Sequence, residues 1–223
     1  MSNILEVDSV TQQYGDRQVL TDIYLKCQTG DIIGLLGRNG SGKSTLLKII
    51  FGATPGNNKF IRIDGEVYRQ PYKTVGQIGY LPQHNFLLNH LTVYKTVSLY
   101  LAADKIEPFL DDAIIGSLQF NKISALSGGE LRYLEIKLLL HSNNKFILLD
   151  EPFNGVAPIV IEQVKVMIIA HSATKGIILT DHDYNNVLDV ANRYCLMYDG
   201  AIKHIENKQD LVRWNYLTES SLG

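Results

Sequence analysis

The chain has 223 residues, of which 45% are hydrophobic and 20% are charged, and its formal net charge is −2. This length suits one α/β domain or a core with a small subdomain, and the charge balance offers no basic surface of the kind that binds nucleic acid. The chain starts without a basic segment followed by an apolar one, so we expect no signal peptide. No apolar run approaches the roughly 20 residues that span a bilayer, so a membrane role would depend on a partner. Cys27 and Cys195 lack metal-type spacing and are expected to be reduced, structural thiols in the cytoplasm.

The first part of the chain alternates apolar and polar residues and predicts strands around one helix. The hairpin within 60–67 is predicted to turn at Asp64-Gly65, a dipeptide that favours tight turns. The expected strands are 4–14, 19–27, 31–36 and 78–81, and the expected helix is 43–51.

Between about residues 85 and 140 the pattern becomes mainly helical, and it then returns to alternating strands and helices. The predicted helices of the middle part are 92–103, 106–118 and 129–140. The last part predicts strands at 146–149, 176–180 and 193–198, and helices at 159–171 and 184–190. Alternation of strands and helices is typical of a mostly parallel sheet covered by helices. We therefore expect a single domain over 1–223, with a core of about 1–84 and 141–223 and a helical insertion of about 85–140.

A phosphate-binding loop follows the apolar strand 31–36. Residues 37–44 fit G-x-x-x-x-G-K-[ST], with a strand before the motif and a helix after it. Glycines let successive backbone N–H groups face one anion, and the helix adds its positive N-terminal end. Lys43 is expected to reach the β- and γ-phosphates of ATP, and the Ser44 hydroxyl to ligate Mg²⁺. The other predicted nucleotide contacts of this loop are Gly37, Asn39, Gly40, Ser41, Gly42 and Thr45.

Two acidic residues end the apolar strand at 146–149. A strand that ends in Asp150 would place one carboxylate beside Mg²⁺, and Glu151 would then face the attacking water as a general base. An acidic turn that only meets solvent is the alternative reading of these residues. The phosphate loop in the same chain favours the metal and base roles.

Further motifs indicate which kind of phosphate-loop ATPase this is. The segment Leu126-Ser127-Gly128-Gly129-Glu130 opens a predicted helix and resembles the LSGGQ signature of ABC ATPases. The other marks of that family stand in the right order: Tyr14 before the phosphate loop, Gln83 after strand 78–81, and His182 after strand 176–180. The chain is thus identified as similar to ABC transporter ATP-binding subunits. The resemblance implies a RecA-like α/β fold with an N-terminal antiparallel β subdomain and an inserted helical subdomain.

The resemblance also implies roles for these residues. Tyr14 would stack on adenine, and Gln83 would reach Mg²⁺ and the attacking water. His182 would bind the γ-phosphate and orient Glu151. The signature residues Ser127, Gly128 and Gly129 would hold the ATP of a second ATPase subunit, in a homodimer that meets head to tail. A simple helix cap, with Ser127 and Glu130 bonded to each other, is a further reading, and both can hold together.

Three features depart from the family pattern. The signature ends in Glu130 where glutamine is commoner, and Ala157 stands where the family usually carries an aspartate that couples the two ATP sites. The stretch between Gln83 and Ser127 is also short, which implies a trimmed helical insertion. The motif Phe-x-Gly-Val-x-Pro at 153–158 resembles that of lipopolysaccharide-export and branched-chain amino-acid import ATPases. This resemblance indicates lineage but not cargo.

The leading hypothesis from the sequence is a Mg²⁺-dependent ATPase subunit that powers a membrane transporter by ATP-driven dimer closure. It would bind transmembrane permease subunits and lie on the inner face of the cell membrane through them. No nucleic acid partner and no direct membrane insertion are expected. A soluble ABC ATPase of translation or DNA repair and a regulatory module with weak hydrolysis stay as alternatives. The second alternative depends on Glu130 and Ala157.

Overall fold

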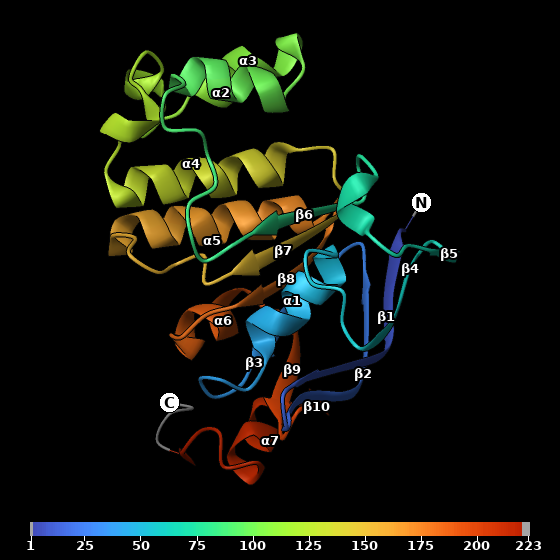
Figure 1. The fold of residues 1–223 in the computed structure, drawn as a ribbon. Helices are drawn as coiled ribbons and strands as arrows, with labels where there is room; N and C mark the ends of the chain where they lie inside the picture. Colours follow the sequence, from blue (N-terminus) through green and yellow to red (C-terminus); the bar gives the residue numbers. More distant parts are fainter. Residues whose placement is uncertain (1, 220–223) are drawn as a thin grey trace.

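The computed structural model describes residues 2–219 and contains two sheets that face each other across helix α1 (Lys43–Phe51) (Figure 1). One sheet is antiparallel, with the strand order β2-β1-β4-β5. Its hairpin turns at Asp64 (φ 54°) and Gly65 (φ 85°), as the dipeptide predicts. Its strands are β1 (Ile4–Tyr14), β2 (Arg17–Gln28), β4 (Asn58–Ile63) and β5 (Glu66–Val67).

The second sheet has the strand order β10-β9-β3-β8-β7-β6. Its strands are parallel except for β10, which pairs with β9 in the antiparallel direction. Every residue of its three central strands β3, β8 and β7 is buried, because layers cover both faces of the sheet. This burial explains why these strands read as short, continuous apolar runs. The strands are β3 (Ile32–Leu36), β6 (Ile78–Leu81), β7 (Phe146–Asp150), β8 (Gly176–Thr180), β9 (Arg193–Tyr198) and β10 (Ala201–Ile205).

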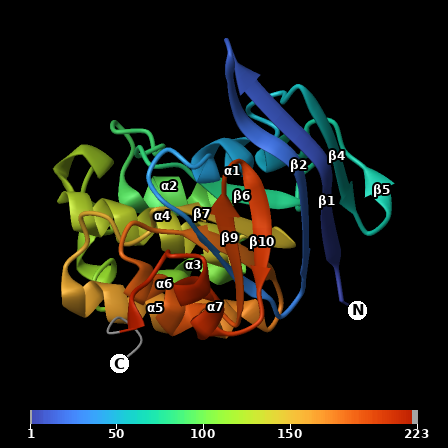
Figure 2. The same ribbon diagram turned by 90° about the horizontal axis from the view of Figure 1, so that it is seen from below.

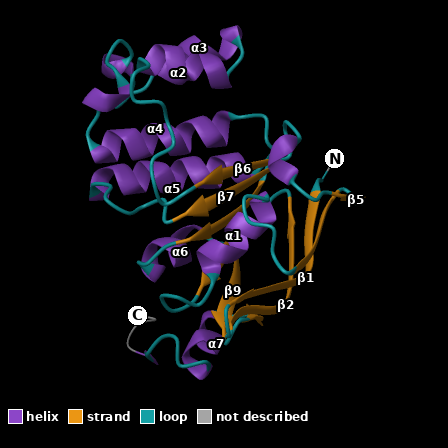
Figure 3. Ribbon diagram, viewed as in Figure 1, coloured by secondary structure: helices purple, strands orange, loops and turns teal. Residues whose placement is uncertain are grey.

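Helices form the layers on this sheet (Figures 2 and 3). Helix α1 packs between the two sheets through four buried aliphatic side chains that belong to the same apolar cluster as the inner face of the antiparallel sheet. The opposite face is covered by α4 (Gly128–His141), α5 (Pro158–Ser172) and α6 (Tyr184–Val190), whose apolar side chains form a second cluster. The short helix α7 (Lys208–Arg213) contacts β10 near the end of the described chain.

The smaller helices α2 (Val93–Tyr100) and α3 (Ala103–Leu110) lie beyond α4, on the side away from the sheet (Figure 1). The helix predicted over 106–118 instead begins at Ala103 and ends at Leu110. Oδ1 of Asp112 accepts hydrogen bonds from the backbone N–H groups of Ile114 and Ile115, both at 2.9 Å, and so starts a new turn in place of a continuing helix. Short 3₁₀ turns complete the connections: Pro71–Lys73, Gly116–Leu118 and Ile123–Ala125.

A mostly buried ion pair joins this outer segment to α4. Nζ of Lys137 lies 2.6 Å from Oδ2 of Asp112, and it also donates to the backbone carbonyl of Phe109 at 2.7 Å. The hydroxyl of Tyr133, one turn earlier on α4, donates to the same carboxylate oxygen at 2.8 Å. The segment after α3 is therefore fixed to the helix that begins at the signature motif.

Both cysteines are buried and free, as the sequence predicts, and burial raises the pKa of each thiol, that of Cys195 to about 12. Within residues 2–219, no helix combines the length and the apolar character that crossing a membrane requires. The fold class inferred from the sequence, a mostly parallel α/β core with an N-terminal antiparallel sheet, is confirmed.

Candidate functional site

The predicted phosphate-binding loop connects β3 to α1 at the carboxyl end of the parallel strands. Gly40 and Gly42 have φ values of 75° and 103°, a region that side chains disfavour, so glycine is required at these turns. The hydroxyl of Ser41 is buried and has no hydrogen-bond partner among residues 2–219. Nζ of Lys43 lies on the carbonyls of Gly37 at 2.6 Å and Arg38 at 3.2 Å. The Lys43 ammonium has no carboxylate within salt-bridge distance in the described part of the chain. Both Ser41 and Lys43 lie beside a helix N-terminus, and this arrangement suits a phosphate group.

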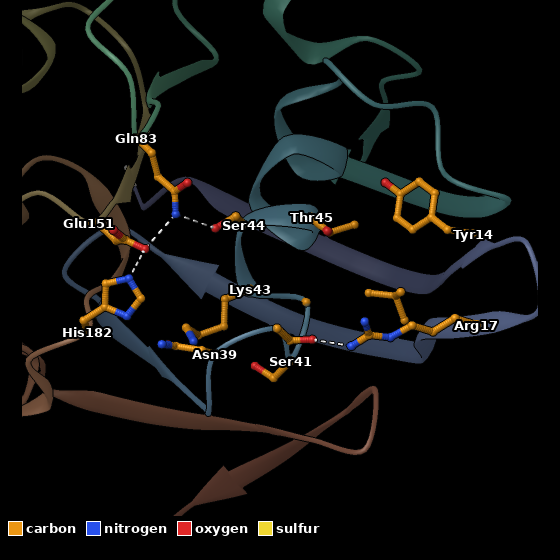
Figure 4. A pocket seen from close by; sticks show the side chains of 13 residues that line it. Tyr14, Arg17, Asn39, Ser41, Lys43, Ser44, Thr45, Gln83, Glu151 and His182 are labelled. Carbon is orange, nitrogen blue, oxygen red and sulfur yellow. Dashed lines mark hydrogen bonds and ion pairs between the residues drawn. The ribbon is translucent and has the colours of Figure 1, made fainter.

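A cavity of about 460 Å³ opens over this loop (Figure 4). It brings together most of the predicted site residues, which come from five separate segments of the chain. Of the predicted residues, Gly37, Asp150, Ser127, Gly128 and Gly129 do not line it. Its lining residues are Tyr14, Arg17, Val19, Asn39, Gly40, Ser41, Gly42, Lys43, Ser44, Thr45, Gln83, Glu151 and His182.

Oxygen atoms suited to Mg²⁺ gather around the Ser44 hydroxyl, which lies at the cavity. The Ser44 hydroxyl donates to Oδ1 of the fully buried Asp150 at 2.9 Å, and the Tyr80 hydroxyl donates to its Oδ2 at 3.0 Å. Burial raises the pKa of the Asp150 carboxyl, although these two hydrogen bonds oppose the shift. Nε2 of Gln83 lies 3.3 Å from the Ser44 hydroxyl, so a metal here would need the other atom of that amide, its oxygen. This hard oxygen set fits Mg²⁺, with ATP phosphates supplying further ligands.

Glu151 holds its carboxylate at the edge of the cavity from an uncommon backbone conformation. Its φ is 53°, a value that costs a non-glycine residue of order 1–3 kcal/mol and occurs often at functional sites. Nε2 of Gln83 lies 2.6 Å from Oε1 of Glu151, and Nε2 of His182 lies 2.8 Å from the same oxygen (Figure 4). The three residues follow three neighbouring strands, β6, β7 and β8, so the sheet brings them together.

Arg132 fixes the backbone next to Gln83 and Glu151, and it was not among the predicted site residues. It is a buried arginine on α4, and its guanidinium donates to the carbonyls of Pro82 at 2.7 Å, Asp150 at 2.7 Å and Glu151 at 2.9 Å. Its counter-charge is the fully buried Glu135, at 3.5 Å. The available signal was two opposite charges three residues apart on a helix with many buried leucines.

Tyr14 and Arg17 form the rim of the cavity at the hairpin between β1 and β2. Half of the Tyr14 side chain is exposed, which leaves a flat ring free beside the loop. Nη2 of Arg17 donates to the carbonyl of Gly40 at 3.1 Å and places a positive charge at the phosphate end (Figure 4). Arg17 was not among the predicted site residues, although it pairs with Tyr14 across the hairpin.

The signature residues lie outside the cavity, at the N-terminus of α4. Oε2 of Glu130 accepts hydrogen bonds from the backbone N–H of Ser127 at 2.8 Å and from its hydroxyl at 2.7 Å. Ser127 caps the helix in return, so the capping-box interpretation of these residues is confirmed. Gly129 lies against the backbone of Gly155, in the loop that follows Glu151.

Comparisons with known proteins agree with this geometry. Residues 20–154, more than half of the chain, match the model of the family described as ABC transporter. The lipopolysaccharide export system ATP-binding protein LptB of Haemophilus influenzae is 35% identical, over 90% of this chain and 89% of its own length. The protein of the same name from Escherichia coli strain K12 is 34% identical, over 89% and 88%. A solved structure described as an ATP-binding subunit of an ABC transporter shares the fold, with a TM-score of 0.82 at 22% identity, covering 96% of this chain and 94% of that one.

Proposed function

The chain belongs to the ABC transporter family, and we propose that two copies of it close around ATP and reopen after hydrolysis to drive a membrane transporter. The chain is an ATP-binding ATPase subunit of that family. We propose a role for each site residue and the partners that would complete the site.

One observation carries the proposal: the cavity and the signature motif are separate within one chain. The cavity holds the loop, Glu151 and His182 but none of Ser127, Gly128 and Gly129. The signature residues sit at the N-terminus of a 14-residue helix, where backbone N–H groups and the helix dipole favour a phosphate. A second chain in head-to-tail orientation would bring its signature to the open side of this cavity.

Binding of ATP would use groups that the structure leaves available. The backbone N–H groups of the loop and the Ser41 hydroxyl would donate to the phosphates, and Lys43 would exchange its carbonyl partners for phosphate oxygens. Tyr14 would stack on the adenine ring. Mg²⁺, held by Ser44, Asp150 and the Gln83 amide oxygen, would neutralise developing charge on the phosphates.

Hydrolysis would depend on Glu151. Its carboxylate would accept a proton from the attacking water as that water approaches the γ-phosphate in line. Gln83 and His182 both contact Oε1 of Glu151, and so would hold the carboxylate in position. His182 would then also donate to the γ-phosphate, and the partner's signature residues would stabilise its charge from the other side.

The transmembrane partner would contact the outer helices. Helices α2 and α3 lie farthest from the sheet, and the loop that leads to them starts at Gln83, beside the Ser44 hydroxyl. Occupancy of the site would therefore shift the inserted segment, about 85–140, against the permease. The protein would be held at the inner face of the membrane by that permease. Because two relatives are named for lipopolysaccharide export, this cargo is the first to test.

A complementation experiment tests the shared site. Lys43→Ala removes the phosphate lysine, and Ser127→Arg blocks the signature, so neither variant should hydrolyse ATP alone. In a mixed dimer, one site would combine the intact Lys43 of one chain with the intact Ser127 of the other. We expect the mixture, together with its membrane partner, to recover about a quarter to a half of wild-type turnover per dimer.

Each outcome decides a specific point. No recovery in a mixture whose dimers are demonstrated by cross-linking would exclude the composite site. Full activity of Ser127→Arg alone would exclude a role for the signature in hydrolysis. A wild-type protein that shows no Mg²⁺-dependent hydrolysis with its permease would favour the regulatory alternative.

A further inference from the structure

A second cavity, of about 480 Å³, lies at the opposite edge of the parallel sheet from the ATP pocket. It opens where α4 and α5 end side by side (Figure 1) and where β8 begins. The ATP pocket, by contrast, lies at the carboxyl ends of the same strands. Polar side chains line the second cavity, among them Lys105, His141, Asn143, His171, Thr174 and Lys175.

Lys175 is the central group of this cavity. It is 7% exposed, and its Nζ donates to the backbone carbonyls of Ser142 at 2.5 Å and Asn144 at 2.8 Å. An ammonium group has three N–H donors, so these two carbonyls leave one donor for another acceptor. Burial lowers the pKa of Lys175, and the charge of Lys105 lowers it further.

The other buried lysines differ from Lys175. Lys137 lies 2.6 Å from Asp112, and Lys165 lies 2.7 Å from Asp189. Over the described chain, 2–219, Lys175 has no carboxylate within 4.0 Å. A buried positive charge normally requires a negative partner. The segment after α4 provides two carbonyl oxygens to Lys175, at Ser142 and Asn144, but no full negative charge.

Lys43 of the phosphate loop shows the same arrangement. Its Nζ also lies on two backbone carbonyls, has no carboxylate within salt-bridge distance in the part of the chain described, and has a pKa that burial lowers. In Lys43 this arrangement keeps an ammonium ready for an anion. The cavity at Lys175 has a similar volume to the ATP pocket, and amide and hydroxyl side chains line it, among them Asn143 and Thr174.

Two histidines extend the same face of the cavity. The rings of His141 and His171 are 4.6 Å apart, and Nδ1 of each lies 2.9 Å from a backbone carbonyl one turn earlier on its own helix. With Nδ1–H donated to that carbonyl, Nε2 of the neutral ring carries a lone pair and donates to an anion only when the ring is protonated, so these rings lie beside the anion that the lysines hold. Among residues 2–219, neither Nε2 atom has a hydrogen-bond partner. Nζ of Lys105, from α3, reaches the cavity at Asn143 Oδ1, at 3.4 Å.

We propose that this cavity binds an anionic group, a phosphate or carboxylate, through Lys175 and Lys105 with the two histidines beside it. The group belongs to a small molecule or to an acidic side chain of a partner. Because Lys105 lies on α3 and Lys175 lies at the start of β8, the bound anion joins the outer helices to the core at a point remote from ATP. This makes the cavity a site where an anion restrains movement of the outer helices.

Imidazole NMR signals of His141 and His171 provide the test. The full-length chain is saturated with Mg·ADP so that the phosphate loop is occupied, and inorganic phosphate, succinate and the peptide Asp-Glu-Asp-Glu are titrated separately at constant ionic strength and pH. We expect saturable shifts of both signals. Lys175→Gln and Lys105→Glu should each weaken binding about tenfold or more, because each removes a charged hydrogen bond. The matched control Lys122→Gln, an exposed lysine that does not line the cavity, should bind like the wild type.

The outcomes separate the sources and decide the proposal. Saturation by phosphate or succinate assigns a small ligand, and saturation by the peptide alone assigns an acidic partner segment. Shifts that sodium chloride reproduces, or that persist unchanged in Lys105→Glu, would overturn the proposal, as would the absence of saturation by all three probes. Lys105 is exposed, so Lys105→Glu remains decisive even if Lys175→Gln fails to fold. An unchanged ADP affinity in the variants shows that the ATP pocket is intact.

Discussion

The phosphate loop and the signature segment of this chain differ in how they satisfy their own polar groups. In the ATP pocket, the Ser41 hydroxyl has no partner within residues 2–219, and Lys43 lies only on backbone carbonyls. At the signature, the hydroxyl and backbone N–H of Ser127 are both bonded to the carboxylate of Glu130. The phosphate loop is therefore open to an anion, whereas the signature is already bonded to the carboxylate of Glu130.

In the proposed dimer, this difference predicts the order in which the two regions would act. Ser41 and Lys43 can turn to a phosphate without leaving a carboxylate, because neither is bonded to one within residues 2–219. In the proposed dimer, the signature would release Glu130 before Ser127 could meet a phosphate. We therefore expect ATP binding to belong to the single chain and signature contact to be the later, weaker step.

Glu151→Gln should have the largest effect, because it removes the base but keeps the shape of the pocket. We expect ATP hydrolysis to fall about 10²- to 10⁴-fold while ATP affinity stays within a few-fold of wild type. Phosphate release and nucleotide titration measure the two quantities. Glu206→Gln, at an exposed position outside the cavity, is the control. If binding and hydrolysis were lost equally, Glu151 would be a structural residue.

Asp112→Asn should have the next largest effect, on stability. It leaves Lys137 with a neutral partner, and we expect the free energy of unfolding at pH 7 to fall by about 2–3 kcal/mol. This loss is no larger than the smallest usual loss for a broken buried ion pair, because the carboxylate is not fully buried. Urea unfolding measures the loss. ATP affinity should not change, which separates this region from the pocket.

The pH dependence of that loss has a defined sign. Burial raises the pKa of the Asp112 carboxyl, but hydrogen bonds from Lys137, Tyr133 and two backbone amides outweigh it, so the folded-state pKa is lowered. The stabilisation is thus fully present above the unfolded-state pKa of about 4 and is lost as pH falls through the folded-state value. Wild type and Asp112→Asn should differ equally at pH 7 and pH 6 and converge below about pH 4. A difference that grew in acid would contradict the assignment.

Ala157→Asp should stabilise the protein modestly. Ala157 occupies the N-cap of α5 with no side-chain hydrogen bond, and an aspartate there would accept one from the first turn. We expect a gain of about 1 kcal/mol, seen as a rise in the thermal midpoint. Ala157→Asn should recover most of it without adding charge, and Ala157→Leu should recover none. No gain in either polar variant would mean that the loop before α5 cannot present a cap.

Glu130→Gln should have the smallest effect, and it tests the contrast directly. A carboxylate at a helix N-terminus contributes about 0.3–1 kcal/mol, so its removal should lower the stability of the free chain by no more than that. The freed signature should favour the ATP-bound dimer by up to about fivefold in a Glu151→Gln background. Analytical ultracentrifugation measures the dimer, and Glu130→Asp retains the charge as a control. A weaker dimer in Glu130→Gln would show that Glu130 assists the partner's phosphate.

Regular elements followed closely from the sequence. The strands Ile4–Tyr14 and Ile78–Leu81 and the helix Lys43–Phe51 have the predicted bounds, because their apolar periods and flanking glycine or proline residues are local signals. The helix predicted over 106–118 was wrong in its bounds, because the Asp112 side chain competes for backbone N–H groups. Strand β10 and helix α7 were not predicted.

Local pattern also predicted the chemistry of the site. Glycine spacing, a lysine at a helix start and acids at a strand end each carry their own physical reason, and Lys43, Ser44 and Glu151 do lie on one cavity. Arg132 was missed because the groups it bonds, three carbonyls from two segments far apart in the sequence, meet only in the folded chain.

The sequence by itself determined the family, the strand and helix periods and most of the predicted residues that line the cavity, because those depend on neighbours along the chain. The tertiary structure decided that Gln83 and His182 share one oxygen of Glu151, since parallel strands bring their carboxyl ends together. It also decided that Lys175 has no carboxylate among the described residues to balance it. Charge balance in a buried place depends on residues far apart in sequence, so only the fold reveals where it is incomplete.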